Sequence, residues 1–385
     1  LDHSVLQRPY LVLKDGIIDG SEPDNTLEIS FDELSHDLRQ YTYSVVHLNG
    51  NNMPSDLQSY EYLAGFTTQD ITDYEYSINT RQDYTHYRFT FPNEDMQLKA
   101  SGNYAIKIYE DGNPDKIVAI ACFSVVEPRV TIQGKVRADT EIEFNGRYQQ
   151  IDVDILTTGL SIRDPKEITI VVQQNHRLDN QAVINQPTYM DGNRLRYINR
   201  RALIFEGGNE YRHFDSYSTY FAGTGIDRIL FDRNDYHAIL MPDANRSLSP
   251  YISDIDADGQ FIINAERTAD SDTEAEYMWV HWTLPADQPM LDGLLYVGGD
   301  LFMNKMNADN LMQYDADAKC YWLTSLVKQG GHDYQYWFCP KGTKKATLQR
   351  IEGSHWETEN EYTIYVYYRP FSSRHDYLIG ISSIR

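Results

Sequence analysis

Three aspartates in one loop have the spacing that comes nearest to a known kind of binding site. Asp254, Asp256 and Asp258 alternate with other residues and are followed by Gly259, which is how an EF-hand calcium loop begins. Such a loop needs a glutamate at its twelfth position, and that position is Ala265 here. No helical pattern flanks the loop. We therefore predict a turn at these aspartates, with a weak surface cation site as the alternative, and no other metal-binding spacing.

The rest of the chain offers no motif for catalysis or for a cofactor. The glycine pairs Gly207-Gly208 and Gly298-Gly299 lack the spacing of a phosphate-binding loop and do not open a helix. The eleven histidines include no HExxH, and no serine lies in a GxSxG context. The carboxylate pair of a glycosidase has no fixed spacing in the sequence, because it is defined by a distance in space, so a motif search does not exclude it. We predict a protein without catalytic residues or a cofactor, and a glycoside hydrolase stays as one alternative.

Charge and composition narrow the classes of partner. The chain has 385 residues, with 34 lysines and arginines against 57 aspartates and glutamates, which gives a net charge of −23. Such acidity disfavours nucleic acid, whose phosphates would be repelled. No apolar run approaches the roughly 18 residues of a membrane helix, so we predict a protein that is not embedded in the membrane. The thirty tyrosines favour β-strands and protein interfaces.

The elements that position these residues are predicted to be β-strands throughout. Short stretches alternate between apolar and polar residues, which is the period of a strand with one buried face. Tyr87, Phe89 and Phe91 form one such face, and a second alternating run starts at Tyr104, so residues 84–109 are predicted to form one β-hairpin. A glycine two residues before Tyr104 is typical of the tyrosine corner of immunoglobulin-like sandwiches, with an ordinary half-buried strand tyrosine as the alternative.

Breaks in the strand pattern predict three all-β domains in tandem. Proline interrupts the pattern at Glu127-Pro128, and the stretch from Pro242 to Pro250 has the composition of a linker. The predicted domains are residues 1–128, 129–249 and 250–385. The first is expected to be an immunoglobulin-like β-sandwich, the second another β-sandwich, and the third a sandwich of the early-set type.

Three cysteines give no disulfide framework. Cys122 falls in the apolar run 117–123, which predicts a core strand. Cys320 and Cys339 lie 19 residues apart, and the sequence leaves open whether they pair. The chain starts at Leu1-Asp2-His3 without an initiator methionine or an apolar leader, so we expect a processed product or a trimmed chain, and secretion is allowed.

Several long motifs resemble those of one protein family. The motif residues are Tyr87, Arg88, Asn93, Glu94, Asp95 and Tyr104 near the start of the chain, and Glu206, Asn209 and Arg212 near its middle. With residues 352–362 and 367–371 they closely resemble the plug proteins of the Bacteroidetes type IX secretion system, a family formerly known as a domain of unknown function. The resemblance implies a non-enzymatic periplasmic protein, associated with the outer membrane. Its partner would be the translocon β-barrel, which it seals from the periplasmic side when no cargo is transported. We expect the motif residues to be structural, with Arg212 paired to carboxylates.

The last predicted domain also resembles the early-set, glycogen-binding type of β-sandwich. In that type exposed aromatic side chains stack on sugar rings, and Trp337 and Trp356 are the candidates here. Strand alternation buries either Tyr336 or Trp337, and the sequence leaves open which of them. A carbohydrate-binding protein of the periplasm or the cell surface is therefore the other alternative.

Overall fold

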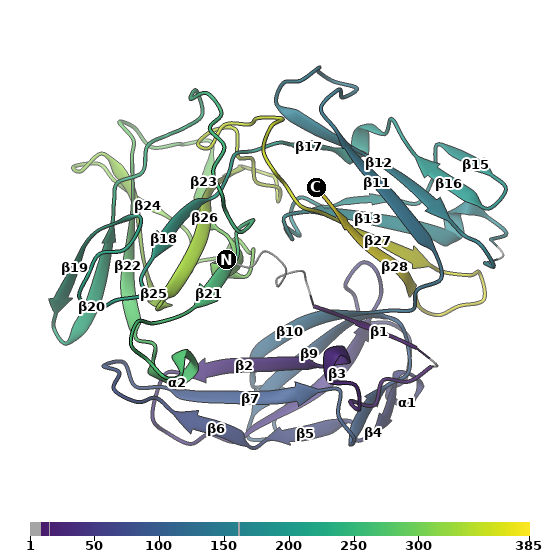
Figure 1. Cartoon of the computed structure of the whole chain (residues 1–385), viewed down its shortest axis with the longest axis horizontal. Coiled ribbons are helices and arrows are strands. Elements are labelled where there is room, and N and C mark those ends of the chain that lie inside the picture. The colour runs from purple at the N-terminus through teal and green to yellow at the C-terminus, as the bar shows by residue number, and fades with distance from the viewer. Residues whose placement is uncertain (1–8, 15, 161) are drawn as a thin grey trace.

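The computed structural model describes residues 9–14, 16–160 and 162–385 and shows three β-sandwich modules arranged as a closed ring (Figure 1). Strands make up 46% of the chain and helices 5%, so the predicted all-β class is confirmed. Both α-helices of the described residues have four residues, and no described helix has the length and apolar character to cross a membrane. The start of the chain at Leu1-Asp2-His3 lies outside the described residues.

The N-terminal module, within residues 9–126, packs a five-stranded sheet on a three-stranded one. Its elements are β1 (Tyr10–Val12), η1 (Pro23–Asn25), β2 (Leu27–Glu33), β3 (Tyr41–Leu48), α1 (Ser59–Tyr62), β4 (Leu63–Gly65), β5 (Thr68–Ile71), β6 (Asp73–Tyr76), β7 (Thr85–Phe91), β8 (Met96–Leu98), β9 (Gly102–Glu110) and β10 (Ile117–Val126). The larger sheet has the order β1-β10-β9-β3-β5 and the smaller one β2-β7-β6. Tyr87 and Phe91 from the smaller sheet meet Tyr104 and Phe123 from the larger one in a fully buried core.

The predicted hairpin over residues 84–109 is wrong, because its two strands belong to opposite sheets. β7 pairs with β2 and β6, whereas β9 pairs with β3 and β10. Between them β8 pairs with β4. The hydroxyl of Tyr104 donates to the carbonyl of Ala100 at 2.7 Å, which is the tyrosine-corner bond at the point where the chain crosses between sheets. Alternation identifies the buried face of a strand, but it does not identify the neighbouring strand.

The middle module is built from two distant parts of the chain. Its elements are β11 (Thr131–Arg137), β12 (Tyr148–Leu156), η2 (Pro165–Glu167), β13 (Ile168–Gln174), β14 (Ala182–Ile184), β15 (Tyr189–Asp191), β16 (Arg194–Tyr197), η3 (Arg201–Leu203), β17 (Ile204–Glu206), β27 (Tyr362–Tyr368) and β28 (Tyr377–Ile384). One sheet has the order β11-β12-β16-β15, with β17 also beside β12, and the other has the order β14-β13-β27-β28. The last two strands of the chain therefore complete a sheet that begins near its middle.

The third module lies between these two parts in sequence, and we call it the inserted module (residues 211–352). Its elements are β18 (Arg212–Asp215), β19 (Ile226–Asp232), β20 (Asp235–Leu240), β21 (Phe261–Ile263), α2 (Ser271–Glu274), β22 (Tyr277–Pro285), β23 (Gly293–Gly298), η4 (Asp300–Phe302), β24 (Gln313–Asp315), β25 (Cys320–Lys328) and β26 (Gly330–Pro340). Five strands form the sheet β19-β20-β22-β25-β24, and β26 pairs with β18, β21 and β23 in the facing one. Trp282, Tyr336 and Phe338 fill the space between the sheets.

Strand pairing agrees with the predicted boundary at residue 128 but not with the one at residue 249. β20 lies in the predicted middle domain but pairs in parallel with β22 of the predicted last domain. β27 and β28 lie in the predicted last domain, yet β27 pairs with β13. We therefore propose an inserted module within a split middle module, in place of three domains in tandem. The linker-like composition of Pro242 to Pro250 marks a loop, because sheet partners are chosen by long-range packing that local composition does not report.

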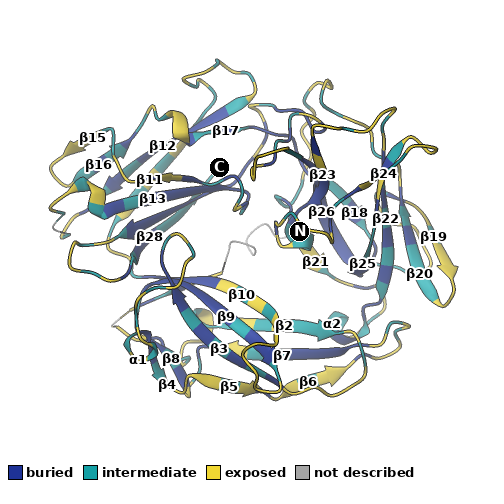
Figure 2. Ribbon diagram, turned by 180° about the vertical axis from the view of Figure 1, so that it is seen from behind, coloured by how far each residue is buried: buried dark blue, intermediate teal, exposed yellow. Residues whose placement is uncertain are grey.

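The cysteines differ from their predicted environments. All three have free thiols, so Cys320 and Cys339 do not pair. The prediction of a core strand around Cys122 is wrong for this residue, which is exposed. Only the second half of β10, from Phe123 onward, is buried, while Ile117, Val118 and Ile120 in its first half are exposed (Figure 2). An apolar run shows what a strand is made of, but not how far the facing sheet extends to cover it.

Candidate functional site

A buried ion pair forms the seam between the N-terminal and the inserted module. Lys328 Nζ lies 2.6 Å from Asp32 Oδ2, and His86 Nδ1 lies 2.6 Å from Asp32 Oδ1. The ammonium group also lies 4.2 Å from the centre of the Tyr84 ring, and the hydroxyl of Tyr277 donates to Asp32 at 2.7 Å. Burial acts to raise the pKa of Asp32, but the hydrogen bond with His86 and the charge of Lys328 hold it below its ordinary value. The charged carboxylate therefore ties the two modules together.

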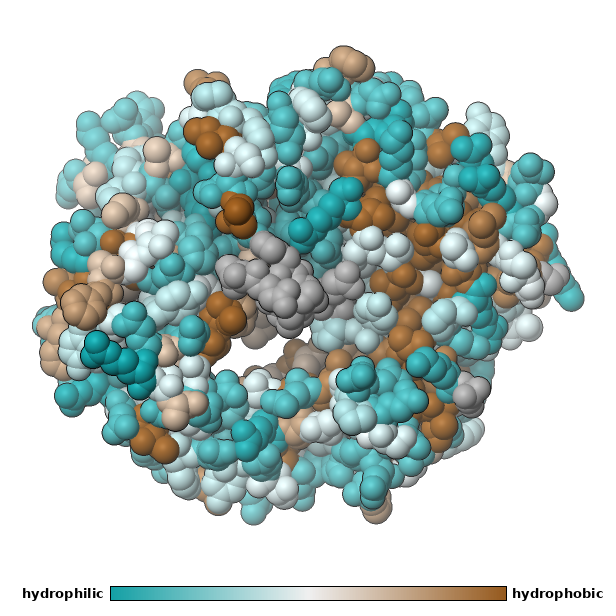
Figure 3. Space-filling view, viewed as in Figure 1, coloured by the Kyte–Doolittle hydropathy of each residue, from teal (hydrophilic) through white to brown (hydrophobic). Residues whose placement is uncertain are grey.

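The two other seams also contain buried polar contacts. Between the N-terminal and the middle module, the hydroxyl of Tyr367 donates to Asn103 Oδ1 at 3.0 Å. Between the middle and the inserted module, the Arg177 guanidinium lies 4.4 Å from the centre of the Trp337 ring and pairs with Asp179 at 2.8 Å. Each module thus contacts both others, and the space-filling view shows that an opening remains between them (Figure 3).

The motif residue Arg212 belongs to a buried charge network in the inserted module. Its guanidinium lies 2.7 Å from Asp243 and 3.0 Å from Glu352, and Arg246 approaches Glu352 to 2.7 Å. Glu352 is fully buried, which acts to raise its pKa, but the two arginines hold the pKa below its ordinary value. Arg212 does pair with carboxylates, as its motif predicts. Because Arg212 begins the inserted module and Glu352 ends it, the network holds the two ends of this module together.

The other motif residues of this stretch hold the same junction. The carboxylate of Glu206 accepts hydrogen bonds from the hydroxyl of Thr347 at 2.8 Å and from a neighbouring backbone N–H at 3.0 Å. The side-chain amide of Asn209 donates to the backbone carbonyl of Glu352 at 2.8 Å. These contacts support the structural role expected for both residues.

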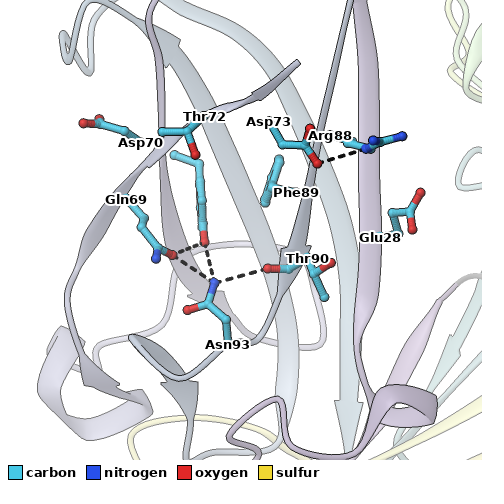
Figure 4. Close-up of a pocket in the computed structure, with 10 residues that line it drawn as sticks. Glu28, Gln69, Asp70, Thr72, Asp73, Arg88, Phe89, Thr90 and Asn93 are labelled. Atoms are coloured by element: carbon cyan, nitrogen blue, oxygen red, sulfur yellow. Dashed lines mark hydrogen bonds and ion pairs between the residues drawn. The ribbon is translucent and has the colours of Figure 1, made fainter. Parts of the chain in front are cut away.

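The first motif block lines a polar hollow on the N-terminal module, with a volume of about 320 Å³ (Figure 4). Arg88 Nε donates to Asp73 at 2.9 Å on one side of it. On the other side Asn93 Nδ2 donates to Gln69 at 3.0 Å and to the hydroxyl of Tyr43 at 3.2 Å. Both motif side chains are already bound within the protein, so the hollow offers no free charged group from either of them.

The remaining residues of this block are split between the core and a surface turn. Tyr87 is buried, and its hydroxyl donates to the backbone carbonyl of Arg39 at 3.1 Å. Glu94 and Asp95 are exposed in the turn before β8, where Asp95 accepts a hydrogen bond from Gln69 at 3.3 Å. These contacts support structural roles for Tyr87 and Asp95, whereas the side chain of Glu94 forms no hydrogen bond or ion pair with a described residue.

The two tryptophans do not form a platform for sugar. Trp337 is 0% exposed, because one face of β26 packs on the module core and the other lies beneath Arg177 and Leu348. Trp337 therefore cannot stack on a ligand, and both Tyr336 and Trp337 are buried instead of one of them. Trp356 is 36% exposed, and its backbone carbonyl accepts a hydrogen bond from Gln149 at 2.8 Å.

The three aspartates of the calcium-like loop do not converge on one point. Asp254 is exposed. Asp256 accepts hydrogen bonds from the backbone N–H groups of Tyr211 and Asp258, and Asp258 pairs with Arg385 at 2.8 Å. Burial raises the pKa of Asp256 to about 8. Within the described ranges no group of three or more histidine, cysteine, aspartate or glutamate side chains is placed to hold a metal ion. The arrangement is that of a turn.

Comparison with known proteins identifies the family. Residues 16–127 match the family described as the first domain of type 9 secretion system plug proteins. A crystal structure of a hypothetical protein from Parabacteroides merdae ATCC 43184 is 40% identical, with a TM-score of 0.94 over 99% of this chain and 94% of that chain. The chain belongs to the type 9 secretion system plug protein family. The matched range ends at the last residue before Pro128, directly after the N-terminal module.

Other comparisons add nothing to this identification. The B domain of a biofilm-associated protein and Escherichia coli alpha-2-macroglobulin are 8% and 9% identical, with TM-scores of 0.16 and 0.15, which are too low to carry an argument. No curated protein matches the chain. Membership of the plug family suggests a role in type IX secretion.

His213 gives the plug-family chain a pH-dependent contribution to stability. Its ring nitrogens lie 2.7 Å from Asp333 and 2.6 Å from Asp215. The hydrogen bond to Asp333 is the main cause that raises the pKa of His213 from 6.5 to about 9, against burial and with help from Asp215. The folded protein holds this proton more tightly than the unfolded chain. The stabilisation is therefore complete below about pH 6.5 and is lost as the pH rises to about 9.

We expect the substitution His213→Asn to remove this dependence. Between pH 6 and pH 9 the difference in free energy of unfolding between wild type and variant should shrink by at most about 3 kcal/mol. Urea unfolding followed at several pH values measures it. A difference that stays constant over this range would show that folding does not raise the pKa of His213.

A groove lies along the seam between the N-terminal and the inserted module, and sequence analysis did not predict it; we call it the seam groove. It has a volume of about 550 Å³ and is lined by the loop Asn79–Arg81 of the N-terminal module and the loop Tyr217–Phe221 of the inserted module. The loop Tyr217–Phe221 shows no alternation of apolar and polar residues, so the strand pattern of the sequence does not identify it. The feature of the sequence that could have indicated this site is the pair of adjacent aromatic residues Tyr220 and Phe221, in a stretch rich in serine, threonine and glycine.

Proposed function

We propose that the protein is a non-enzymatic periplasmic plug of the type IX secretion system. It binds the periplasmic side of the outer-membrane translocon barrel and seals it when no cargo is transported. The observation that carries this proposal is the match of residues 16–127 to the first domain of plug proteins. The match suggests interaction with a component of the secretion system and a location in the periplasm or envelope.

The architecture supports this role. A plug has to keep its shape against a pore, and a ring in which each module contacts both others resists deformation better than modules joined only by linkers. The seams that close this ring contain buried polar contacts, which include the ion pair of Lys328 and Asp32. The alternative of a carbohydrate-binding protein loses support, since Trp337 is fully buried.

Deletion of the gene in the source organism tests the proposal. We expect an outer membrane that becomes several-fold more permeable to a large antibiotic such as vancomycin, because an unsealed translocon leaves a wide aqueous path. The wild-type gene should restore the barrier, and affinity-tagged protein should retain the translocon barrel from detergent extracts. An unchanged barrier together with no retained barrel would overturn the proposal.

A further inference from the structure

The seam groove is lined by residues of both the N-terminal and the inserted module. Its floor is fixed, because the carboxylate of Glu276 in the inserted module accepts hydrogen bonds from the backbone N–H groups of Arg81 and Gln82 in the N-terminal module. Ile78 N also donates to the carbonyl of Thr273 at 2.9 Å. With about 550 Å³ the groove lies within the range of ligand pockets, which is about 300–1,000 Å³.

One wall of the groove presents large aromatic rings to solvent. Tyr220 is 79% exposed and Phe221 is 67% exposed. The backbone N–H groups of both donate to the hydroxyl of Ser218, at 3.3 and 3.4 Å, which holds the loop in a turn that projects the rings. Beside them the guanidinium of Arg81 lies 5.8 Å from the centre of the exposed Phe231 ring. Tyrosine, phenylalanine and arginine are enriched in protein–protein interfaces.

The groove also carries a carboxylate that has no direct ion-pair partner among the described residues. Glu274 and Glu276 are bound by backbone N–H groups, but the exposed side chain of Glu266 forms no hydrogen bond or ion pair with a described residue. The groove holds three carboxylates against Arg81 and Arg267. The whole chain has a net charge of −23. The overall charge, together with the slight excess of carboxylates in the groove, therefore favours a basic partner.

We propose that this seam groove is the surface on which the translocon barrel docks, through an extended periplasmic segment that carries apolar side chains next to a lysine or arginine. The apolar side chains pack against Tyr220 and Phe221, and the basic group pairs with Glu266. The inference rests on the proposed function and adds the contact surface to it. Because both modules line the groove, the segment binds the closed ring better than an open one, and binding in turn stabilises closure.

Retention of the purified translocon barrel by immobilised full-length protein tests the groove. We expect the double variant Tyr220→Ser/Phe221→Ser to bind at least ten-fold more weakly than wild type. Glu266→Lys should also bind more weakly, and its defect should be larger at low than at high ionic strength, because salt screens the repulsion. Phe144→Ser is the matched control, since Phe144 is 77% exposed on the middle module, and it should bind like wild type.

The possible results separate the two proposals. If wild-type protein retains the barrel and the groove variants retain it equally well, the groove is not the contact surface, while the proposed function stands. If wild-type protein itself retains no barrel, the groove proposal fails, and the proposed function fails with it when deletion of the gene also leaves the barrier unchanged. Circular dichroism and thermal unfolding of each variant should match wild type, because the substituted side chains are exposed, and a variant that unfolds early is replaced by Tyr220→Ser alone.

Discussion

Replacing Glu352 with glutamine is expected to lower the free energy of unfolding of the inserted module by about 3–5 kcal/mol, the usual cost of leaving buried charges without their partner. Glu352 is 0% exposed and faces both Arg212 and Arg246. Glutamine keeps the size of the side chain but not its charge, so both guanidinium groups lose their main counterion. Arg212 then keeps Asp243 as its carboxylate partner, and Arg246 loses the carboxylate that it faces.

Tryptophan fluorescence during urea unfolding measures this effect, since four of the five tryptophans lie in the inserted module. The modules can unfold separately, so the transition is assigned to this module rather than to the whole chain. Glu357→Gln is the control, because Glu357 lies five residues away and is exposed, and it should leave the midpoint unchanged. Equal midpoints for Glu352→Gln and wild type would show that the network does not stabilise the module.

The second large effect is expected at the seam that closes the ring. The substitution Lys328→Met keeps most of the side-chain length but removes the charge that faces Asp32, and we expect a loss of about 3 kcal/mol from the contact between modules. The backbone amide hydrogens of Ile78, Arg81 and Gln82 should then exchange faster, since these N–H groups donate across the seam. Small-angle X-ray scattering should show a larger radius of gyration.

A double-mutant cycle distinguishes a true pair from two independent effects. Asp32→Asn alone leaves Lys328 without its carboxylate, whereas Asp32→Asn with Lys328→Met removes both charges together. The double variant should therefore lose less than the sum of the single losses. Lys341→Met, at an exposed position, is the control for removing a lysine charge. Losses that add up would mean that the two residues do not act as a pair across the seam.

A ring that opens should also dock less well if the seam groove is the contact surface. Lys328 does not line the groove, but the loop Asn79–Arg81 belongs to the same module boundary. If Lys328→Met retains less barrel, the cause is therefore a shift of this loop in the groove and not the loss of a direct contact between Lys328 and the barrel. The stability of the ring and its binding surface are linked in this way.

The all-β class, the acidic charge of the chain and the plug family were all predicted from the amino-acid sequence. Alternation along the strands is set by local residue type, so the all-β class and the buried face of Tyr87 and Phe91 were readable. The carboxylate pairing of Arg212 was predicted as well, whereas the tyrosine corner at Tyr104 was one of two alternatives until the structure showed its hydrogen bond.

Tertiary structure alone decided which strands pair, which aromatic residues are covered and where a partner surface lies. β7 and β9 look like a hairpin because they are adjacent in sequence, but packing between sheets assigns them to opposite layers. The sequence left open whether Trp337 is exposed for stacking or buried, and Arg177, from the middle module, covers it. The groove beside Tyr220 exists only because residues near 80 and near 220 meet at the seam, and no local pattern encodes a contact over such a distance.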